Sequence, residues 1–541
     1  MIRWTIVALV FGLLVSGVLF DRIDQAPAPA ALPVPAAVVS PSLVEPARLS
    51  DVWFCPVGSG SVDGYAAHQL DITNLGDRTA VANIDLMTGT GPGSGLRVEV
   101  EPLTTETVDL PSLDQAPLLG ATVEIVNGQG VVGHSVTTIQ GVVQGPCSTS
   151  TSSSWFFADG VTTRDSTEYL ALLNPFAEDV VFRVTFQTSG RTREPEDLEA
   201  AVVPGRSVRV IDVGQYVSRE SHVATTIETV KGQLAVERLQ LTNGDLGPRG
   251  ASLQLGVMAP ALAWTLPAGR VHDGGDQRLV VYNPGEVLAE VDIEFDLSPV
   301  DRASYGLVPV EAVVQPGRFA VVDLKETLSQ SGLPLPYEFG VRVVSANAVP
   351  VVVERWQITP PIDSSLIGAG GNDARIVGSP SLPGRLGRSI GLGAGLTAHW
   401  LRQTDADPDE VPEEEAPGSL DPAVGLIQPT ATMGSATSRG VEVMSNRWVV
   451  AWLPLLGDNT AIVVSGQEGT AVEVSVVVAG ELLPAGRAVV PAAGWISIPV
   501  SASVAAAPVI IQADQPVVAE AMVVEPDVGL AVIPAIPVLT P

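Results

Sequence analysis

The chain has 541 residues, which is too long for a single domain of ordinary size, and its 60 acidic and 29 basic residues give a net charge of −31. Such a surface repels nucleic-acid phosphates and anionic lipid headgroups, which excludes a nucleic-acid-binding role. Apolar residues, mostly Val, Ala and Leu, make up 46% of the chain and aromatic residues only 5%, a composition that favours short β-strands over long helices.

The N-terminus contains one apolar segment. Residues 4–20 carry no charge and follow Arg3. As a helix they would span about 25 Å, slightly less than the ~30 Å hydrocarbon core of a bilayer. We favour an uncleaved membrane anchor over a cleaved signal peptide, because no small-x-small cleavage site follows the segment directly. In both cases Arg3 stays in the cytoplasm and the rest of the chain lies outside it.

The next segment, residues 21–50, is rich in Ala and Pro, which predicts a semi-extended stalk. A first β module is expected over residues 51–147, between Cys55 and Cys147. Because export places these cysteines in an oxidising compartment, we predict a disulfide between them; the alternative is two free buried thiols. On the chain-entropy model such a bond stabilises by about 4–5 kcal/mol at most.

The middle of the chain repeats an ordered set of short motifs. The order is Trp with Gly five residues later, then Asn-Pro, Pro-Gly-Arg and Val-Glu-Arg. One copy runs from Trp155 to Arg238 and the next from Trp264 to Arg355, with a Trp-to-Asn spacing of 19 residues in both. A fixed order of motifs over about a hundred residues is typical of tandem modules.

Two weaker copies flank these. The first has His134-Ser135 in place of Glu-Arg, and the last has Glu520-Ala521. Terminal repeats are commonly the degenerate ones. We therefore expect modules over 51–147, 155–260, 261–402 and 446–541, with these repeat anchors: Trp53, Trp155, Trp264, Trp452, Asn74, Asn174, Asn283, Glu237, Arg238, Glu354, Arg355 and Glu520.

Within the modules, apolar and polar residues alternate in short runs such as 180–186, 289–295 and 471–478. Period-two patterning with frequent turn residues predicts an all-β chain, a string of tandem immunoglobulin-like β-sandwich modules behind the N-terminal helix. Asn174 and Asn283 are expected at equivalent strand ends, where Asn-Pro stops a ladder. Helical periodicity is scarce, and residues 323–330 are expected to form one turn.

Residues 403–445 combine many acidic residues with few large apolar ones, which predicts a disordered linker that is dispensable for folding. Asp405, Asp407 and Asp409 have the spacing of a calcium loop. The Gly and Glu that such a loop needs at positions six and twelve are missing, so we interpret the segment as solvated rather than cation-binding.

The combination of Trp-x-x-x-x-Gly, Asn-Pro, Pro-Gly-Arg and Val-Glu-Arg, followed by Gly250-Ala-Ser-Leu before the next Trp, resembles a repeated module of exported actinobacterial proteins, a family of unknown function. The second and third copies match well, and the first and fourth loosely. The resemblance implies a β protein of the cell envelope and no particular activity.

One motif has the pattern of a serine nucleophile, Gly387-Arg-Ser389-Ile-Gly391. It functions only on a strand-to-helix turn with an acid and a histidine downstream, and His399 is the only histidine that follows it. A chance match is the simpler interpretation in a chain with 53 glycines. The five histidines are scattered without metal-ligand spacing, and no cofactor motif occurs.

The Glu-Arg pairs are the strongest repeated polar sites. Because neighbours on a strand point to opposite faces, the two members of a pair cannot line one surface. We expect one member to make a structural hydrogen bond or ion pair and the other to be solvated; the alternative is a ligand site.

These features predict a non-catalytic envelope scaffold or an adhesion-like interaction protein, held at the cytoplasmic membrane by residues 4–20 or otherwise secreted. Its partner would be an envelope protein or a cell-wall polysaccharide. An alternative is glycan binding by exposed tryptophans, for which Trp400, Trp448 and Trp495 are candidates. A serine hydrolase using Ser389 is a remote third hypothesis. No catalytic or metal-binding residue is predicted under the first hypothesis.

Overall fold

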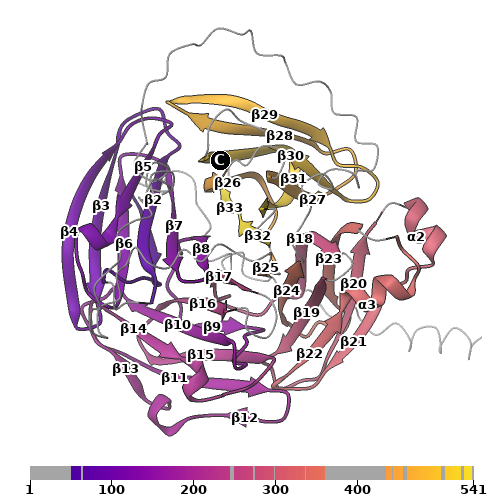
Figure 1. Ribbon diagram of the computed structural model, residues 1–541, viewed down its shortest axis with the longest axis horizontal. Helices are drawn as coiled ribbons and strands as arrows, with labels where there is room; N and C mark the ends of the chain where they lie inside the picture. The colour runs from indigo at the N-terminus through magenta and orange to yellow at the C-terminus, as the bar shows by residue number, and fades with distance from the viewer. Residues whose placement is uncertain are drawn as a thin grey trace, which may run out of the picture.

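In the computed structural model the chain forms four β modules that follow one another around a ring (Figure 1). The structure describes residues 50–61, 65–243, 249–271, 275–297, 299–334, 337–359, 434–441, 443–454, 460–500, 506–525 and 529–538. The expected anchor, stalk, nucleophile motif and calcium-like aspartates fall outside these ranges. Among the described residues, no helix is long and apolar enough to cross a membrane.

Module 1 has eight antiparallel strands in two sheets. Its strands are β1 (Ser50–Cys55), β2 (Ala67–Asn74), β3 (Ala80–Thr88), β4 (Gly91–Val100), β5 (Thr105–Asp109), β6 (Leu119–Val126), β7 (Gly130–Thr138) and β8 (Gly141–Pro146). One sheet has the order β1-β6-β3-β4 and the other β5-β2-β7-β8. Trp53 and Val123 of the first sheet and Leu70 and Ile72 of the second are buried in one core between them.

Modules 2 and 3 repeat this order. Module 2 comprises β9 (Ser154–Phe157), β10 (Ser166–Asn174), β11 (Val180–Thr188), β12 (Thr192–Arg193), β13 (Ala201–Val203), β14 (Ser207–Asp212), β15 (Val223–Lys231), β16 (Ala235–Asn243) and β17 (Arg249–Leu255). Module 3 comprises β18 (Ala263–Val271), β19 (Asp276–Asn283), β20 (Ala289–Asp296), β21 (Val310–Val314), β22 (Arg318–Asp323), β23 (Tyr337–Ser345), β24 (Val352–Thr359) and β25 (Gly434–Arg439).

Module 4 joins its two sheets through one long strand. It comprises β26 (Ser445–Pro454), β27 (Thr460–Gly466), β28 (Ala471–Val478), β29 (Glu481–Val489), β30 (Trp495–Pro499), β31 (Ala506–Glu525), β32 (Gly529–Pro534) and β33 (Ile536–Val538). The first half of β31 pairs with β26 and β28, and its second half pairs with β27 and β32. This strand therefore serves as both the sixth and the seventh strand of the module.

The strand order shares two pairings with immunoglobulin domains. The second strand pairs with the fifth, as B does with E, and the third pairs with the sixth, as C does with F. The outer strands differ, because the first strand joins the sheet of the third and sixth and the seventh joins the sheet of the second and fifth.

Alternating sequence accounts for these strands. In β20, the residues Val291, Ile293 and Phe295 are buried on one face while Glu290 is exposed. The three alternating runs predicted from the sequence are confirmed as β11, β20 and β28. The helical turn expected at 323–330 is present as α3 (Leu324–Gln330), capped by Asp323, whose carboxylate accepts a hydrogen bond from the Glu326 amide. A further helix, α2 (Pro299–Tyr305), was not expected.

The modules form a closed ring and not the string that the sequence suggested. At each of the first three junctions, the sheet that contains the first strand of one module packs against the sheet that contains the second strand of the next module. The same contact joins module 4 to module 1: Val449, Ala451, Ile536 and Val538 pack into the core cluster of module 1. The four eighth strands, β8, β17, β25 and β32, lie nearest the centre of the ring (Figure 1). Closure buries the apolar face that a terminal module of a string leaves open.

The predicted disulfide is confirmed. Cys55 at the end of β1 is bonded to Cys147, just after β8, with a Cα–Cα distance of 4.8 Å. Both residues are buried. The bond therefore ties the two sheets of module 1 to each other.

The repeated tryptophans are buried in the module cores. The Trp155 indole donates to the Leu234 carbonyl at 2.9 Å, and the Trp264 indole donates to the Val351 carbonyl at 2.8 Å. In module 4 the equivalent residue is Trp448, which donates to the Val517 carbonyl at 3.0 Å and is fully buried. The assignment of Trp452 as the anchor of this copy was therefore wrong by four residues.

The asparagine anchors occupy equivalent strand ends, as predicted. Asn74, Asn174 and Asn283 are the last residues of β2, β10 and β19. Each side-chain amide donates to the carbonyl four residues later, and each side-chain oxygen accepts from the backbone amide two residues later. The same side chain thus closes the same turn in three modules.

The linker expected at 403–445 is too long at its C-terminal end. Residues 434–439 form β25, which pairs along β24 from Glu354↔Arg439 to Thr359↔Gly434. β25 is the eighth strand of module 3, and in the other modules this strand begins within six residues of the end of the seventh. Residues 360–433 therefore interrupt a hairpin of module 3; they do not separate two complete modules.

The two tryptophans of β26 distinguish the corrected register from the expected one. We expect Trp448→Ala to cost about 3–5 kcal/mol of unfolding free energy, because it leaves a cavity in the core of module 4. Trp452→Ala should cost clearly less, because Trp452 is partly exposed. Chemical denaturation of both variants checks this, and a larger loss for Trp452→Ala would contradict the assignment.

Candidate functional site: buried polar relays at the module junctions

The two Glu-Arg pairs lie on the seventh strands of modules 2 and 3, β16 and β24, and both members of each pair are buried. Glu237, Arg238, Glu354 and Arg355 are all at most 2% exposed. Each glutamate points to the preceding module and each arginine to the following one. The expectation that one member would be solvated was therefore wrong. Opposite faces of a strand are both interior surfaces here, because a sheet of the ring is covered on both sides.

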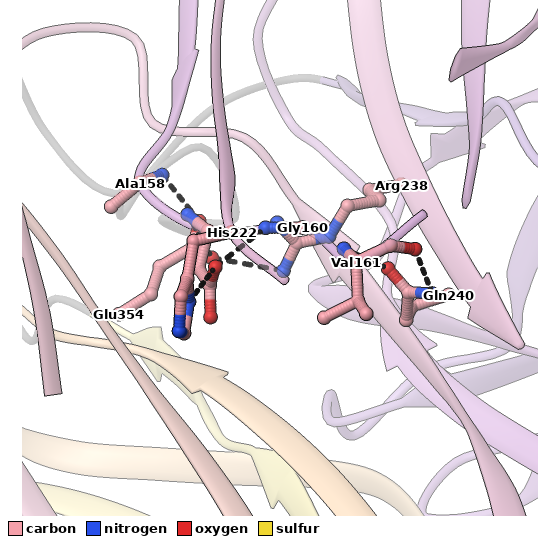
Figure 2. A network of polar contacts seen from close by, with 8 residues as sticks. Ala158, Gly160, Val161, His222, Arg238, Gln240 and Glu354 are labelled. Atoms are coloured by element: carbon pink, nitrogen blue, oxygen red, sulfur yellow. Dashed lines mark hydrogen bonds and ion pairs between the residues drawn. The ribbon is translucent and has the colours of Figure 1, made fainter. Parts of the chain in front are cut away.

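The junction between modules 2 and 3 shows the arrangement most completely (Figure 2). The Glu354 carboxylate accepts from the backbone amides of Ala158 and Asp159 at 3.1 and 3.2 Å, just beyond the end of β9. It also accepts from Nη2 of Arg238 at 2.9 Å. The guanidinium lies over the Phe157 ring, with 5.3 Å between Cζ and the ring centroid. One carboxylate thus binds both the backbone and the cation of the preceding module. We call such a buried contact between a glutamate and a cationic side chain across a junction a relay.

The surrounding charges hold Arg238 in its charged form. Burial opposes that charge, but the neighbouring acidic groups, Glu354 first among them, outweigh burial and raise the pKa of Arg238. Nη2 of Arg238 donates also to Oε1 of Gln254 at 2.7 Å. A buried, paired and charge-assisted contact of this kind fixes geometry strongly.

The junction between modules 3 and 4 repeats the arrangement. Glu520 accepts from the Ala268 amide at 3.2 Å and from Nη2 of Arg355 at 3.3 Å. The Ala268 amide is available as a donor because β18 is irregular between Leu266 and Gly269, which frees this amide from the ladder. Nη1 of Arg355 donates to the Leu266 carbonyl at 3.4 Å.

At the junction between modules 1 and 2 a histidine replaces the arginine. Nε2 of His134 lies 2.9 Å from Oε1 of Glu237, and Oε2 of Glu237 accepts from the Val57 amide at 3.2 Å. Nδ1 of His134 lies 3.0 Å from Nε2 of His68, whose Nδ1 lies 3.1 Å from the Leu119 carbonyl. All five residues are buried.

These contacts fix the protons of the histidine chain. A carbonyl only accepts, so Nδ1 of His68 carries a proton and its Nε2 accepts from Nδ1 of His134. One proton then remains for the contact between His134 and Glu237, which corresponds to the Arg-Glu pairs of the other junctions. Burial and the adjacent His134 hold the pKa of His68 well below its usual range, which agrees with the neutral form.

The junction between modules 4 and 1 lacks this relay. Strand register places Gly133 opposite Asp71, as Glu237 stands opposite Ala171 and Glu354 opposite Val280. Gly133, and not His134, is therefore the counterpart of the glutamate, and His134 is the counterpart of the arginine. Ala521 stands where the other modules have a cation. The missing glutamate and the missing arginine belong to the same junction.

A second polar position lies on the second strand, six residues before the asparagine anchor. Its occupants are His68, Glu168 and Gln277. Side chains added at Gly58 and Gly160 would overlap His68 and Glu168, which explains the Gly of the Trp-x-x-x-x-Gly motif in these two copies. In the third copy the Gly269 position faces the Phe339 carbonyl instead.

Glu168 is the least compensated of these groups. It is fully buried, and neither carboxyl oxygen has a hydrogen-bond partner among the described residues. Burial raises its pKa to about 8, against the opposing effect of Arg238. Glu168 is therefore a neutral acid at neutral pH.

The other sequence candidates are not brought together with these relays. Trp448 and Trp495 are buried at 0% and 8% exposure. Trp400, Ser389 and the three spaced aspartates lie outside the described residues. In the described ranges, no group of three or more His, Cys, Asp or Glu side chains is placed to hold a metal ion.

Sequence reasoning missed His68, Glu168 and Asp71. Aligning the copies on the asparagine anchors puts the first two in one column, so a signal for them was present. Asp71 carries no such signal, because its column holds Ala171 and Val280 in the other copies.

The contacts of the relay carboxylates attach each module to the one before it. Each relay carboxylate accepts hydrogen bonds from two or three donors of the preceding module, although Oε1 of Glu520 has no partner among the described residues. The repeated polar residues therefore hold the modules in a fixed relative orientation.

Comparison with known proteins gives one family match. Residues 134–352 match a family model described as "Family of unknown function (DUF5719)". The matched region starts in β7, contains module 2 and ends at the start of β24. The chain thus resembles an uncharacterised family over the two copies in which the repeat is clearest. A search of curated proteins finds no match.

Solved structures give only weak likenesses. The structure of Thermotoga maritima 1070 is 15% identical, with 20% of this chain and 95% of that chain covered and a TM-score of 0.18. A tetra-tandem repeat from the extending region of a large adhesion protein is 11% identical, covering 90% and 97%, with a TM-score of 0.10. An α-L-rhamnosidase of Streptomyces avermitilis is 10% identical, covering 60% and 47%, with a TM-score of 0.12. These scores carry no argument.

Breaking a relay should be costly. We expect Glu354→Gln to reduce the unfolding free energy by about 3–5 kcal/mol, because Arg238 is left buried without its anion. The matched control is Glu228→Gln, which removes the exposed ion pair with Arg183 and should cost at most about 1 kcal/mol. Denaturant unfolding of both variants tests this. Equal losses of unfolding free energy would mean that the relay stabilises the fold no more than an exposed ion pair does.

Glu168 should make stability depend on pH. Its folded pKa of about 8 lies above the ordinary value of 4.5, so the folded state retains a proton that the unfolded state has released. Its contribution is therefore fully present below pH 4.5 and is lost as the pH rises through about 8. We expect the melting temperature of the Glu168→Gln variant to exceed that of the wild type by a margin that grows between pH 5 and pH 8. The substitution introduces the residue type found at the equivalent position in module 3, Gln277. A difference in melting temperature that stays constant over this range would refute the assignment.

Proposed function

We propose that this chain is a non-catalytic extracytoplasmic scaffold or adhesion-like interaction protein of the cell envelope, held at the cytoplasmic membrane by residues 4–20. The observation that carries the proposal is that the repeated polar residues bind neighbouring modules to one another. Glu237, Glu354 and Glu520 each accept hydrogen bonds from the module before them. Residues that recur in the modules therefore support architecture, and recognition belongs to loops that differ between them.

The disulfide supports the proposed location. Cys55 and Cys147 are the only cysteines of the chain, and they are bonded to each other. Such bonds persist in oxidising compartments outside the cytoplasm. The acidic surface, with a net charge of −31, also fits a protein that remains soluble next to an anionic membrane.

Exposed tryptophan side chains would favour glycan binding, and the structure provides no such support at two of the three candidate positions. Trp448 belongs to the core of module 4, Trp495 is buried in an apolar cluster that also contains Ala268 of module 3, and Trp400 lies outside the described residues. We therefore do not propose a glycan-binding role. The partner that we expect is a protein of the envelope.

Affinity capture from a solubilised envelope tests this function. The intact chain is compared with a Glu354→Gln, Glu520→Gln double variant, in which the relays are broken while the surface loops are unchanged. We expect a protein, and not a polysaccharide, to be retained by the wild type and lost with the variant. Retention of polysaccharide, or labelling of Ser389 by a fluorophosphonate probe, would overturn the proposal. Digestion of the chain by protease added to wall-stripped intact cells checks the location.

A further inference from the structure

The junction between modules 4 and 1 differs from the other three in its connection. The chain passes directly from module 1 to 2, from 2 to 3 and from 3 to 4, and each of these junctions also contains a relay. The fourth junction is formed by surfaces of the first and last modules of the chain. It has no covalent link, so its stability depends entirely on the contacts across it.

Those contacts are mostly apolar. Val449, Ala451, Ile536 and Val538 of module 4 pack against module 1. A polar contact across the junction runs from Oγ1 of Thr73 to the Ala451 carbonyl, at 3.2 Å. At the two relay positions stand Gly133, whose missing side chain makes room for Ala451, and Ala521.

One carboxylate nevertheless lies in this junction. Asp71 is 3% exposed and stands directly opposite Gly133 on the neighbouring strand. Its Oδ1 accepts from the Thr107 hydroxyl at 2.8 Å. Each relay carboxylate of the other junctions has an arginine or histidine of the preceding module as its partner. The described residues of module 4 that lie beside Asp71 include no such cation.

A small hollow next to Asp71 marks the same place. It is lined from module 1 by Asp71, Gly133, His134 and Gln144, among others, and has a volume of about 10 Å³, enough for roughly one water molecule. From module 4 it is lined by Val450, Ala451, Trp452, Ile533, Pro534 and Ile536, none of which titrates. His134 is the one other titratable group that lines it, and its Nε2 is engaged by Glu237.

We propose that the junction between modules 4 and 1 is the seam at which the ring opens, and that ionisation of Asp71 loosens it. Opening separates Asp71 from module 4 and exposes it to water, while the other three junctions keep their relays. The ring then becomes a chain of four modules with two exposed apolar faces, one on module 1 and one on module 4.

The direction of the pH dependence follows from the burial of Asp71. Burial raises its pKa from 3.8 to about 6, against the effects of Thr107 and His134. The closed ring therefore binds a proton that the open ring releases, so closure is favoured in acid and weakens as the pH rises through about 6. With these values the opening equilibrium increases about tenfold between pH 5 and pH 8.

Single cysteines measure this opening in the full-length chain. Both native cysteines are in the disulfide, so an introduced cysteine is the only free thiol. Val131 and Val352 are fully buried and stand two residues before Gly133 and Glu354 on equivalent strands. Val131→Cys reports the seam, and Val352→Cys reports the junction between modules 2 and 3. Labelling by 4,4′-dithiodipyridine is corrected at each pH for the rate in the unfolded chain.

We expect Val131→Cys to label at least about tenfold faster than Val352→Cys at pH 8, and its corrected rate to fall about tenfold toward pH 5. Adding Asp71→Asn should remove this pH dependence, because the amide retains the contact with Thr107 and does not ionise. The exposed Asp109→Asn is the matched control and should leave it unchanged.

Two outcomes would overturn the proposal. Equal labelling of the two thiols would mean that the ring opens only by global unfolding. A pH dependence that persists with Asp71→Asn would assign it to another group. If Val131→Cys does not fold, Val449→Cys reports the same seam from module 4. Ala521→Arg, which places a cation across from Asp71, should slow labelling at either position.

Discussion

The ring depends on a buried carboxylate that enters the preceding module and binds backbone amides there. A carboxylate out of water is stabilised by the hydrogen bonds that it accepts, and those accepted by Glu237, Glu354 and Glu520 permit little freedom in how two modules meet. The amides that receive them lie where the first strand of the module ends or becomes irregular, as at Ala158 and Ala268. An irregularity in one sheet is thereby converted into a binding position for the next module.

The placement of Glu and Arg on adjacent residues extends this constraint around the ring. Since neighbouring side chains of a strand point to opposite faces, Glu354 reaches module 2 while Arg355 reaches module 4. Two consecutive residues of one strand thus link three modules. The disulfide has a comparable role within module 1, where it joins the two sheets.

The features that could be predicted from the sequence are local ones. Alternation predicted β11, β20 and β28, and the recurrence of Asn-Pro predicted the equivalent turns at Asn174 and Asn283, because a strand and its turn depend on residues close in sequence. The disulfide followed from compartment and cysteine count. Ring closure was not predictable in this way, since it depends on the fit between residues far apart, such as Thr73 and Ala451.

The polar site was predicted in its residues but not in its arrangement. The Glu-Arg pairs were found as repeats, but the assumption that one face of a strand meets solvent concealed that both are buried. The counterpart of the glutamate in module 1 is Gly133, and a glycine gives no sequence signal for a missing partner. Trp448 was overlooked because it lies four residues before Trp452, which fits a looser version of the motif. β25 was assigned to a linker because it follows an acidic run and is itself rich in Gly, Ser and Thr, whereas its strand partner lies before residue 360.

The displaced position of β25 has a consequence for synthesis. β24 ends at Thr359 and its partner begins at Gly434. A ribosome adding about 5–20 residues per second takes roughly 4–15 s to make the intervening residues. During this interval the nascent module 3 has an unpaired strand edge at the centre of the future ring, next to β17 of a module that is already complete. Unpaired edges are the places where chains join wrongly. Between the synthesis of β24 and that of β25, the growing chain is therefore most prone to pair with another molecule.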